Sequence, residues 1–337
     1  MVPLRLLTPL RTTWNPAQYH GFGRRRRFFE GWYFKSVSPS GDAVLAIIPG
    51  VSRPDAGEPH AFVQVLDGLN RTSAYHRYEL SEFHASRDRF DISVGPNHFS
   101  LDRIELDIAG AEALRGELRF TGVHSWPARL LSPGAMGWYS LVPAMECYHG
   151  VLSFNHRIEG SLTFAGRTLD FTGGKGYIEK DWGRSFPKTW VWMQTNHFAE
   201  AEASLTVSVA HIPWLGSSFT GCIIGMWLRG RLYRFATYTG AAVSRLEVSL
   251  DRVALRVEDR RHALEVNCRR HEGTIIAAPS LGAMTGRIAE AMTAEIEVCL
   301  SRKDHGQLCR VFADTGRHAG LEVVGDSGLL ETGGKSV

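Results

Sequence analysis

The amino-acid sequence lacks several features that would assign a protein to a class at once. Its 337 residues contain no run of about 18 apolar side chains, the length that a membrane-spanning helix requires. The first residues carry two prolines and no sustained apolar stretch, which makes them a poor signal peptide. Five cysteines, an odd number, are widely spaced without a C-x-x-C pair, which argues against a zinc ribbon or a thioredoxin-type motif. We therefore expect reduced thiols and a cytoplasmic protein.

The sequence also lacks the motifs that hold common cofactors. The glycines around Lys175 have neither the spacing nor the Ser or Thr of a phosphate-binding loop. Arg26 stands where a dinucleotide fingerprint starting at Gly21 needs its third glycine. No H-E-x-x-H or G-x-S-x-G motif occurs, and the 14 histidines do not form a metal set. We therefore expect a site without a cofactor or a metal ion.

Neither sign of charge is in large excess. The net charge of +3 is small for this length, and no broad basic field or nucleic-acid-binding module is present, so we expect no nucleic-acid partner. One basic run stands out, consisting of Arg24, Arg25, Arg26 and Arg27. It is explained most simply as a solvated surface. The alternative is a peripheral contact with the anionic headgroups of a membrane.

Helical periodicity is scarce, whereas short runs of β-forming residues separated by turn residues recur along the chain. Even spacing of short strands is typical of antiparallel barrels or sandwiches. Pro, Gly and Ser are frequent around residues 125–143, which indicates a domain boundary or crossover. We predict an all-β protein with few helices, organised as an irregular basic segment (1–27), a first β-domain (28–140), a second β-domain (141–325) and a flexible tail (326–337).

One segment concentrates ionisable and aromatic side chains. Glu179, Lys180 and Asp181 adjoin Trp182 within residues 171–183, and a run with two tryptophans and two carboxamides follows at 190–196. Charges beside large aromatic surface are costly to bury without a partner. This segment is therefore more typical of a binding or catalytic site than of a core.

Strand parity sorts these side chains by face, because alternate residues of a strand point to the same side. Several predicted strands then carry a face on which aromatic residues alternate with a few hydrogen-bonding groups, the composition of a small-molecule pocket. The alternative for any one of these residues is an ordinary structural role. Taken together they predict a pocket for a hydrophobic ligand, lined by Trp32, His60, Gln64, Tyr148, Trp182, Trp190, Trp192, Gln194 and Asn196.

Four carboxyl groups are candidates for an acid in this pocket, namely Glu30, Glu146, Glu179 and Asp181. Glu30 shares a strand face with Phe28 and Trp32, and burial there would raise its pKa and keep it protonated near neutrality. Lys180 would oppose such a shift in whichever carboxylate it pairs with. A carboxylic acid held away from water is a candidate general acid. The alternative is a set of salt bridges, such as Asp181–Arg184 or Glu179–Lys180.

With these residues in place, the sequence resembles the tocopherol cyclase family and its bacterial relatives. The resemblance extends from about Tyr19 to at least Gly240, and its most specific element is the glutamate-lysine-x-tryptophan-glycine motif that ends at Gly183. The sequence departs from the plant-type pattern in having Asp181 where that pattern has Asn, so the chemistry or the substrate can differ. The residues that carry the resemblance are 29–34, 145–149, 174–183, 186–187, 190–196 and, more weakly, 235–240.

The resemblance implies two lipocalin-like antiparallel β-barrel domains, as in the related carotenoid hydratases and some Diels–Alder cyclases. It also implies an activity: plant and cyanobacterial members close a chromanol ring from a prenylated hydroquinone without a cofactor. An acid protonates an alkene of the prenyl tail, and the phenol oxygen traps the resulting tertiary cation. Such a site needs aromatic faces that stabilise positive charge, and it must exclude water.

These demands lead to a hypothesis for the roles of the candidate residues. Asp181 or Glu179 would be the acid, with Glu30 and Glu146 as alternates. The tryptophans would line the pocket, while Gln194 and Asn196 would orient the phenol. Two rival interpretations stay open: a non-catalytic lipid-binding protein that uses the same pocket, and an isoprenoid hydratase.

Overall fold

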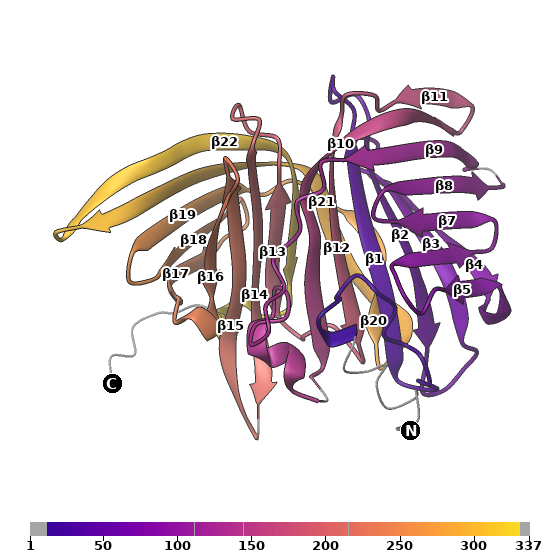
Figure 1. Ribbon diagram of the computed structural model, residues 1–337, viewed down its shortest axis with the longest axis horizontal. Helices are drawn as coiled ribbons and strands as arrows, with labels where there is room; N and C mark the ends of the chain where they lie inside the picture. Colours follow the sequence, from indigo (N-terminus) through magenta and orange to yellow (C-terminus); the bar gives the residue numbers. More distant parts are fainter. Residues whose placement is uncertain (1–11, 111, 144, 215, 331–337) are drawn as a thin grey trace. The chain divides into compact units, whose positions relative to one another are not determined.

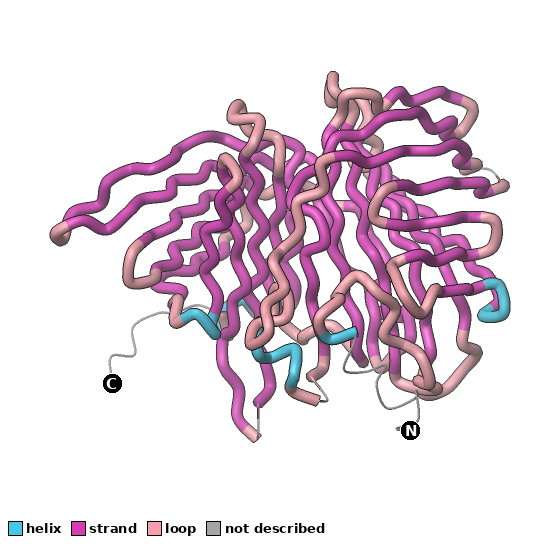
Figure 2. Tube along the Cα trace, in the orientation of Figure 1, coloured by secondary structure: helices cyan, strands magenta, loops and turns pink. Residues whose placement is uncertain are grey.

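The computed structural model describes residues 12–110, 112–143, 145–214 and 216–330, and these residues are almost entirely in β-strands (Figure 1). Figure 2 shows strands throughout, with helical turns only as short connections. The all-β class with antiparallel strands is confirmed. In the described part of the chain, no helix is long and apolar enough to cross a membrane.

The described chain divides into two compact units. Unit 1 contains the chain up to Phe186 together with Ile276–Arg287, and unit 2 contains Pro187–Ile275 and the chain from Ile288 onward. The domain boundary expected at 140/141 falls inside unit 1. The reason is that the strands after residue 141 pair with the strands before it, so they complete the first sheet and do not begin a second one.

Unit 1 is built on a 12-stranded antiparallel sheet with the order β4-β3-β2-β1-β12-β10-β9-β8-β7-β6-β5, and β11 pairs with β10. In Figure 1, β12 lies between β1 and β10, although it is far from β1 in sequence. Two 3-10 turns, η2 (Leu80–Glu82) and η3 (Gly137–Leu141), connect strands. The strands are β1 (Phe28–Val37), β2 (Val44–Arg53), β3 (His60–Asp67), β4 (Thr72–Glu79), β5 (Phe83–Ala85), β6 (Asp91–Val94), β7 (Asn97–Ser100), β8 (Arg103–Ile108), β9 (Leu114–Thr121), β10 (Cys147–Phe164), β11 (Arg167–Asp170) and β12 (Lys175–Gly183).

Unit 2 is built on a 10-stranded antiparallel sheet with the order β16-β15-β14-β13-β22-β21-β19-β18-β17, and β20 pairs with β21. The end of β20 and the start of β21 form a hairpin that belongs to unit 1. The 3-10 turns are η4 (Thr237–Thr239) and η5 (Ser327–Leu329). The strands are β13 (Trp190–Thr195), β14 (Ala203–Trp214), β15 (Ser217–Leu228), β16 (Arg231–Ala236), β17 (Ala242–Val248), β18 (Arg252–Glu258), β19 (His262–Arg269), β20 (Thr274–Ser280), β21 (Ala283–Asp304) and β22 (Gln307–Val324).

Each sheet is open, because its strand order has two free ends among the described residues. The expectation of closed barrels was therefore wrong in this respect, although the class holds. Each unit nevertheless has its own continuous apolar core, which in unit 1 includes Trp32, Phe34 and Ile178 and in unit 2 includes Val191, Met193 and Leu205. Of the predicted tail, residues 331–337 lie outside the described residues.

Candidate functional site

The site is organised by β12, whose side chains alternate between the two faces of the unit 1 sheet. Its pairing with β1 sets Trp32 opposite Lys180 and Phe34 opposite Ile178, on the face that carries the apolar core. We call this the inner face. Tyr177, Glu179 and Asp181 point to the opposite, outer face. Charged groups from one strand thus serve two separate clusters.

The inner face carries an ion pair between Lys180 and Glu30, whose side chains are both fully buried. The Lys180 Nζ lies 2.5 Å from Glu30 Oε1. Backbone N–H of His20 donates to both carboxylate oxygens of Glu30, at 2.9 and 3.0 Å. Lys180 Nζ also donates to the backbone oxygens of Pro16, at 3.0 Å, and Gln18. Every charge in this cluster therefore has a partner.

The surroundings of Glu30 correct the sequence hypothesis that it is a protonated acid. Burial alone would raise its pKa, but the Lys180 ammonium and the hydrogen bond from His20 hold it below the ordinary value. Burial lowers the pKa of Lys180 to about 8, with Glu30 offsetting part of the effect. Burial and Lys180 likewise lower the pKa of His20. Glu30 is thus an ion-paired carboxylate and not a free acid.

The aromatic residues predicted to line a chamber on this face are packed against other side chains of unit 1. Trp32 is fully buried and stacks on Phe90 with ring centroids 5.4 Å apart. Trp182 stacks on His20, with ring centroids 4.2 Å apart, and on Tyr148, with ring centroids 5.5 Å apart. Trp32 and Trp182 therefore pack against side chains of the protein itself, and the expectation that they line a substrate pocket stays a prediction.

The outer face carries the second cluster, formed by His149, Glu179 and Asp181. The register of β10 and β12 sets His149 directly opposite Asp181, and their Nδ1 and Oδ1 atoms lie 2.9 Å apart. His149 Nε2 lies 3.9 Å from Glu179 Oε2, and the Tyr177 hydroxyl donates to that same oxygen at 2.6 Å. The side chain of Asp181 keeps 22% of its surface exposed, more than those of His149 or Glu179. An imidazole thus bridges two carboxylates, of which Asp181 is the more accessible.

The charge of this cluster follows from its geometry. Burial would lower the pKa of His149, but Asp181 and then Glu179 outweigh burial and raise it to about 9. The imidazole is consequently protonated at neutral pH and ion-paired with Asp181. Burial and the neighbouring Asp181 also keep the Cys147 thiol, 3.9 Å from Asp181 Oδ1, protonated by raising its pKa well above the ordinary value.

Sequence reasoning missed His149 and Tyr177 as members of this cluster. The parity of 146–154 does place His149 on the face opposite to Tyr148, but the sequence alone offered no partner there. The partner became visible only once residues 175–183 formed a strand beside β10. Among the contacts described, Glu179 accepts from Tyr177, Asp181 pairs with His149, and Lys180 pairs with Glu30.

The same three residues present a nitrogen and two oxygen donors within 4.8 Å of one another, a set that could also hold a divalent cation. A metal would have to displace the proton that the carboxylates hold on His149, because only a neutral imidazole binds metal. The existing hydrogen bond from Nδ1 to Asp181 and the raised pKa fit a proton-holding unit better.

The remaining predicted residues of unit 1 have distinct surroundings. Gln64 is buried and its Oε1 accepts from the backbone N–H of Ala277 at 2.9 Å, while His60 Nε2 lies 2.7 Å from the Tyr75 hydroxyl. Both lie on β3, which β2 and β1 separate from β12. Glu146 precedes β10, and its backbone oxygen accepts from Arg184 N–H at 2.8 Å. Arg24–Arg27 are exposed, and Arg27 pairs with Asp55 at 2.6 Å.

Unit 2 carries the other predicted lining residues on one face of β13. Trp190, Trp192, Gln194 and, just beyond the strand, Asn196 are all buried. Trp190 Nε1 donates to Glu322 Oε2 at 2.7 Å. The parity prediction is confirmed, whereas the assignment of these residues to substrate binding stays a prediction.

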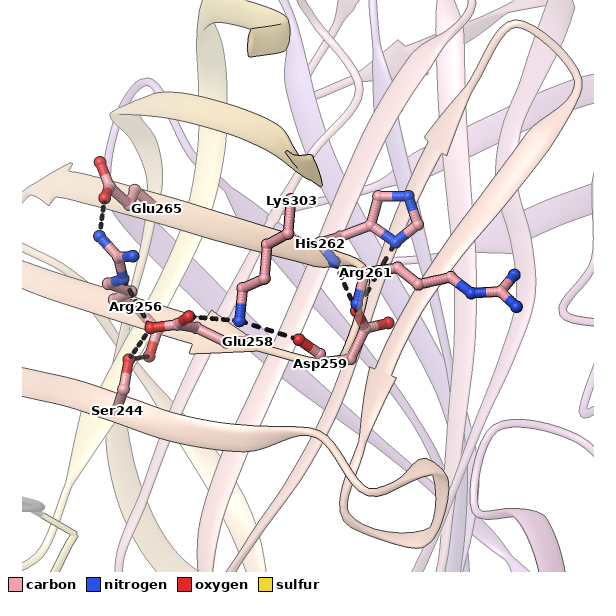
Figure 3. Close-up of polar contacts among 8 residues, drawn as sticks. All are labelled: Ser244, Arg256, Glu258, Asp259, Arg261, His262, Glu265 and Lys303. Atoms are coloured by element: carbon pink, nitrogen blue, oxygen red, sulfur yellow. Dashed lines mark hydrogen bonds and ion pairs between the residues drawn. The ribbon is translucent and has the colours of Figure 1, made fainter. Parts of the chain in front are cut away.

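Unit 2 also holds a network of charged groups near the surface (Figure 3). Glu258 receives Lys303 Nζ at 2.7 Å, Arg256 Nε at 2.9 Å and the Ser244 hydroxyl at 3.1 Å. These bonds lower the pKa of Glu258 to about 2, with Lys303 as the largest contributor. Figure 3 shows the Lys303 ammonium reaching from β21 to Glu258 and to the backbone of Asp259. This network joins residues of β17, β18 and β21 near the surface of unit 2.

Comparison with known proteins agrees with the sequence resemblance. A probable chloroplastic tocopherol cyclase of Oryza sativa subsp. japonica is 22% identical, over 91% of this chain and 77% of that protein. A chloroplastic tocopherol cyclase of Zea mays is also 22% identical, over 79% of this chain and 67% of that protein. The crystal structure of CghA with Sch210972 has a similar fold, with a TM-score of 0.57 at 11% identity over 89% of each chain.

The family described as tocopherol cyclase-like matches residues 104–325, from β8 to just past β22, and so includes the β10 and β12 strands that carry His149, Glu179 and Asp181. This match covers more than half of the chain, and the protein therefore belongs to the tocopherol cyclase-like family.

Proposed function

We propose that this protein is a cofactor-independent cyclase of a prenylated quinol or a related isoprenoid lipid. Membership of the tocopherol cyclase-like family supports a cyclase-type enzyme. The observation that carries the proposal further is the His149–Asp181 pair beside Glu179, because it gathers the proton donors and acceptors that an acid-initiated ring closure needs.

In the proposed reaction, Asp181 delivers the proton, which it receives from the His149 imidazolium across their 2.9 Å contact. Its proton moves to one carbon of the prenyl double bond, a C–H bond forms, the π bond breaks, and the other carbon becomes a tertiary cation. His149 is neutral once it has passed this proton on, and the proton released at ring closure restores the imidazolium through Glu179, whose Oε2 lies 3.9 Å from His149 Nε2.

The second half of the reaction closes the ring and restores the proton. The phenol oxygen attacks the tertiary cation, a C–O bond forms, and the phenol proton leaves to a carboxylate of the cluster. Glu179 is positioned to accept it, and Tyr177, which donates to Glu179, is positioned to relay it. The substrate and product have the same mass, and no oxidant or reductant is required.

The outer face also offers aromatic surface to stabilise the cation. Tyr33 lies directly opposite Glu179 in the β1–β12 register, and Tyr177 precedes Glu179 by two residues on the same face. Both rings are buried or nearly so. Aromatic faces attract positive charge through their quadrupole, most strongly where water is excluded. These two tyrosines take the place that the sequence hypothesis gave to Trp32 and Trp182.

The test is incubation with a prenylated hydroquinone in D₂O, followed by mass spectrometry. We expect a product that carries one non-exchangeable deuterium on carbon and otherwise has the substrate's composition. Asp181→Asn should lower turnover by about 10²–10⁴-fold, the usual contribution of a general acid, while ligand binding is retained. Asp107→Asn, which changes a carboxylate in an exposed pair with Arg115, is the matched control and should keep full activity.

Other outcomes would point elsewhere. A product heavier by one water would indicate a hydratase, and unchanged ligand that co-purifies with the protein would indicate a carrier. Full activity in Asp181→Asn would remove that residue from the role of acid. Activity that disappears with a chelator and returns with a divalent cation would show that the cluster holds a metal.

A lipid substrate of this class would be drawn from a membrane, and we propose that the exposed Arg24, Arg25 and Arg26 contribute to that contact. Replacing these three arginines with glutamine should weaken co-sedimentation with anionic phosphatidylglycerol vesicles and leave binding to neutral phosphatidylcholine vesicles unchanged. Equal sedimentation of both proteins with anionic vesicles would contradict this contact.

A further inference from the structure

Residues 12–22, here called the strap, cross the inner face of the unit 1 sheet without forming a strand. Ala17, Gln18 and Tyr19 are buried. Trp32 Nε1 donates to the backbone oxygen of Ala17 at 3.0 Å, and Gln18 Nε2 donates to that of Asp88. The strap is therefore packed into the core of the unit.

Lys180 makes several of the contacts that hold the strap. This side chain donates to the backbone oxygens of Pro16 and Gln18 and lies 2.8 Å from His20 Nδ1. Its ammonium lies 4.7 Å from the ring centres of both Trp32 and Trp182. Lys180 thus joins three successive parts of the strap to β12.

The strap lies directly behind the outer cluster. His20 stacks on Trp182, the residue after Asp181. Pro16 contacts β10 at Gly150, the residue after His149, so closely that a Cβ on Gly150 would lie 3.2 Å from the Cβ of Pro16. The two residues that meet at 2.9 Å on the outer face therefore each have a neighbour held by the strap on the inner face.

We propose that Lys180 is a positioning residue, which fastens the strap onto the inner faces of β10 and β12 and thereby holds His149 and Asp181 at hydrogen-bonding distance on their outer faces. The proposal deepens the proposed function, on which it rests for the identity of the acid, because it explains how that acid is placed. Its test does not depend on turnover, however, since the His149–Asp181 contact can be observed without substrate.

The readout is the pH titration of His149 by NMR of the full chain, with the ring signals assigned by loss in His149→Gln. The sign of the change in the pKa of His149 in Lys180→Met separates two explanations. Removing a nearby positive charge would by itself raise the pKa of His149. Loss of positioning would lower it toward the ordinary value, because Asp181 moves away. We expect a decrease of about tenfold in proton affinity.

A second variant tests the strap without changing any charge. Gly150→Ala places a methyl group against Pro16 and should push the strap away from β10. We expect the pKa of His149 to fall in this variant as well. The His20 amide, which donates to Glu30 in the intact protein, should exchange its hydrogen faster. Gly221→Ala in β15 of unit 2, whose added Cβ would also meet side chains at 3.2 Å, is the matched control and should leave His149 unchanged.

Each outcome decides the proposal. A lowered pKa of His149 in Gly150→Ala supports it even where Lys180→Met fails to fold. An unchanged or raised pKa of His149 in variants whose His20 amide has lost protection would overturn it, because the strap would then be free while the cluster stayed in place. If the protein has no cyclase activity but His149 responds as expected, the positioning role stands and the proposed function does not.

Discussion

Two lysine–glutamate pairs in this protein have almost the same geometry and different surroundings. Lys180 and Glu30 in unit 1 lie 2.5 Å apart and are fully buried, whereas Lys303 and Glu258 in unit 2 lie 2.7 Å apart with 34% and 25% of their side chains exposed. In the first pair burial is the largest influence on both pKa values. In the second pair the hydrogen bonds to Glu258 are the largest influence on its pKa.

The comparison teaches that distance alone does not tell what an ion pair does. Desolvating two charges costs several kcal/mol each, so a buried pair is by itself weak evidence of stabilisation. In unit 1 the pair also contacts the strap, and we propose that it holds the strap behind the His149–Asp181 cluster. In unit 2 the pair stays partly exposed and links β21 to β18 across the intervening strand β19.

The largest expected effect comes from breaking the buried pair. Glu30→Leu should lower the free energy of unfolding by about 3–5 kcal/mol, because it leaves the Lys180 ammonium buried without its counter-charge. The double variant Glu30→Leu with Lys180→Met should recover part of this loss, since no buried charge remains. Urea titration monitored by tryptophan fluorescence measures both.

A decrease of less than about 1 kcal/mol in the free energy of unfolding of Glu30→Leu, the size expected for an exposed pair, would contradict this difference between the two pairs. Such a result would mean that water reaches the cluster and that Lys180 is not held in the way that its contacts indicate. The double variant is the internal control, because it removes the same side chains without isolating a charge.

Much of the fold could be predicted because short-range patterns decide it. Alternation predicted that Glu30 and Trp32 share a strand face, and they do so on β1. The long C-terminal strands were harder: residues 285–298 fitted both helix and strand, and they lie within β21.

The candidate site could be predicted only in part, because it depends on long-range pairing. The segment with Glu179, Lys180 and Asp181 was recognised by its composition, yet it was not predicted as a strand. Only its pairing with β1 on one side and β10 on the other places Lys180 beside Glu30 and Asp181 beside His149. Composition cannot show which of two adjacent charges points inward when the register is unknown.

The next effect is a pH dependence of stability that originates in His149. Its pKa is raised from the ordinary value of 6.5 to about 9 in the fold, so the stabilisation is fully present below pH 6.5 and is lost as pH rises through 9. The difference corresponds to about 3 kcal/mol. Urea titrations at about pH 6 and about pH 9.5 should therefore differ much more in the wild type than in His149→Gln. Equal losses in the two proteins would assign the effect to other groups.

The smallest effect completes the comparison in unit 2. Glu258→Gln should lower the free energy of unfolding at neutral pH by at most about 1 kcal/mol, because solvent screens the groups around it and several hydrogen bonds can be kept by the amide. The pKa of Glu258 is lowered to about 2, so the stabilisation is present above the ordinary glutamate value and is lost as pH falls toward 2. The difference between wild type and variant should accordingly shrink in acid and in high salt, which urea titrations at about pH 7 and about pH 3 can measure. A loss as large as that of Glu30→Leu would show that the network in Figure 3 is shielded from water, and exposure would then no longer separate the two pairs.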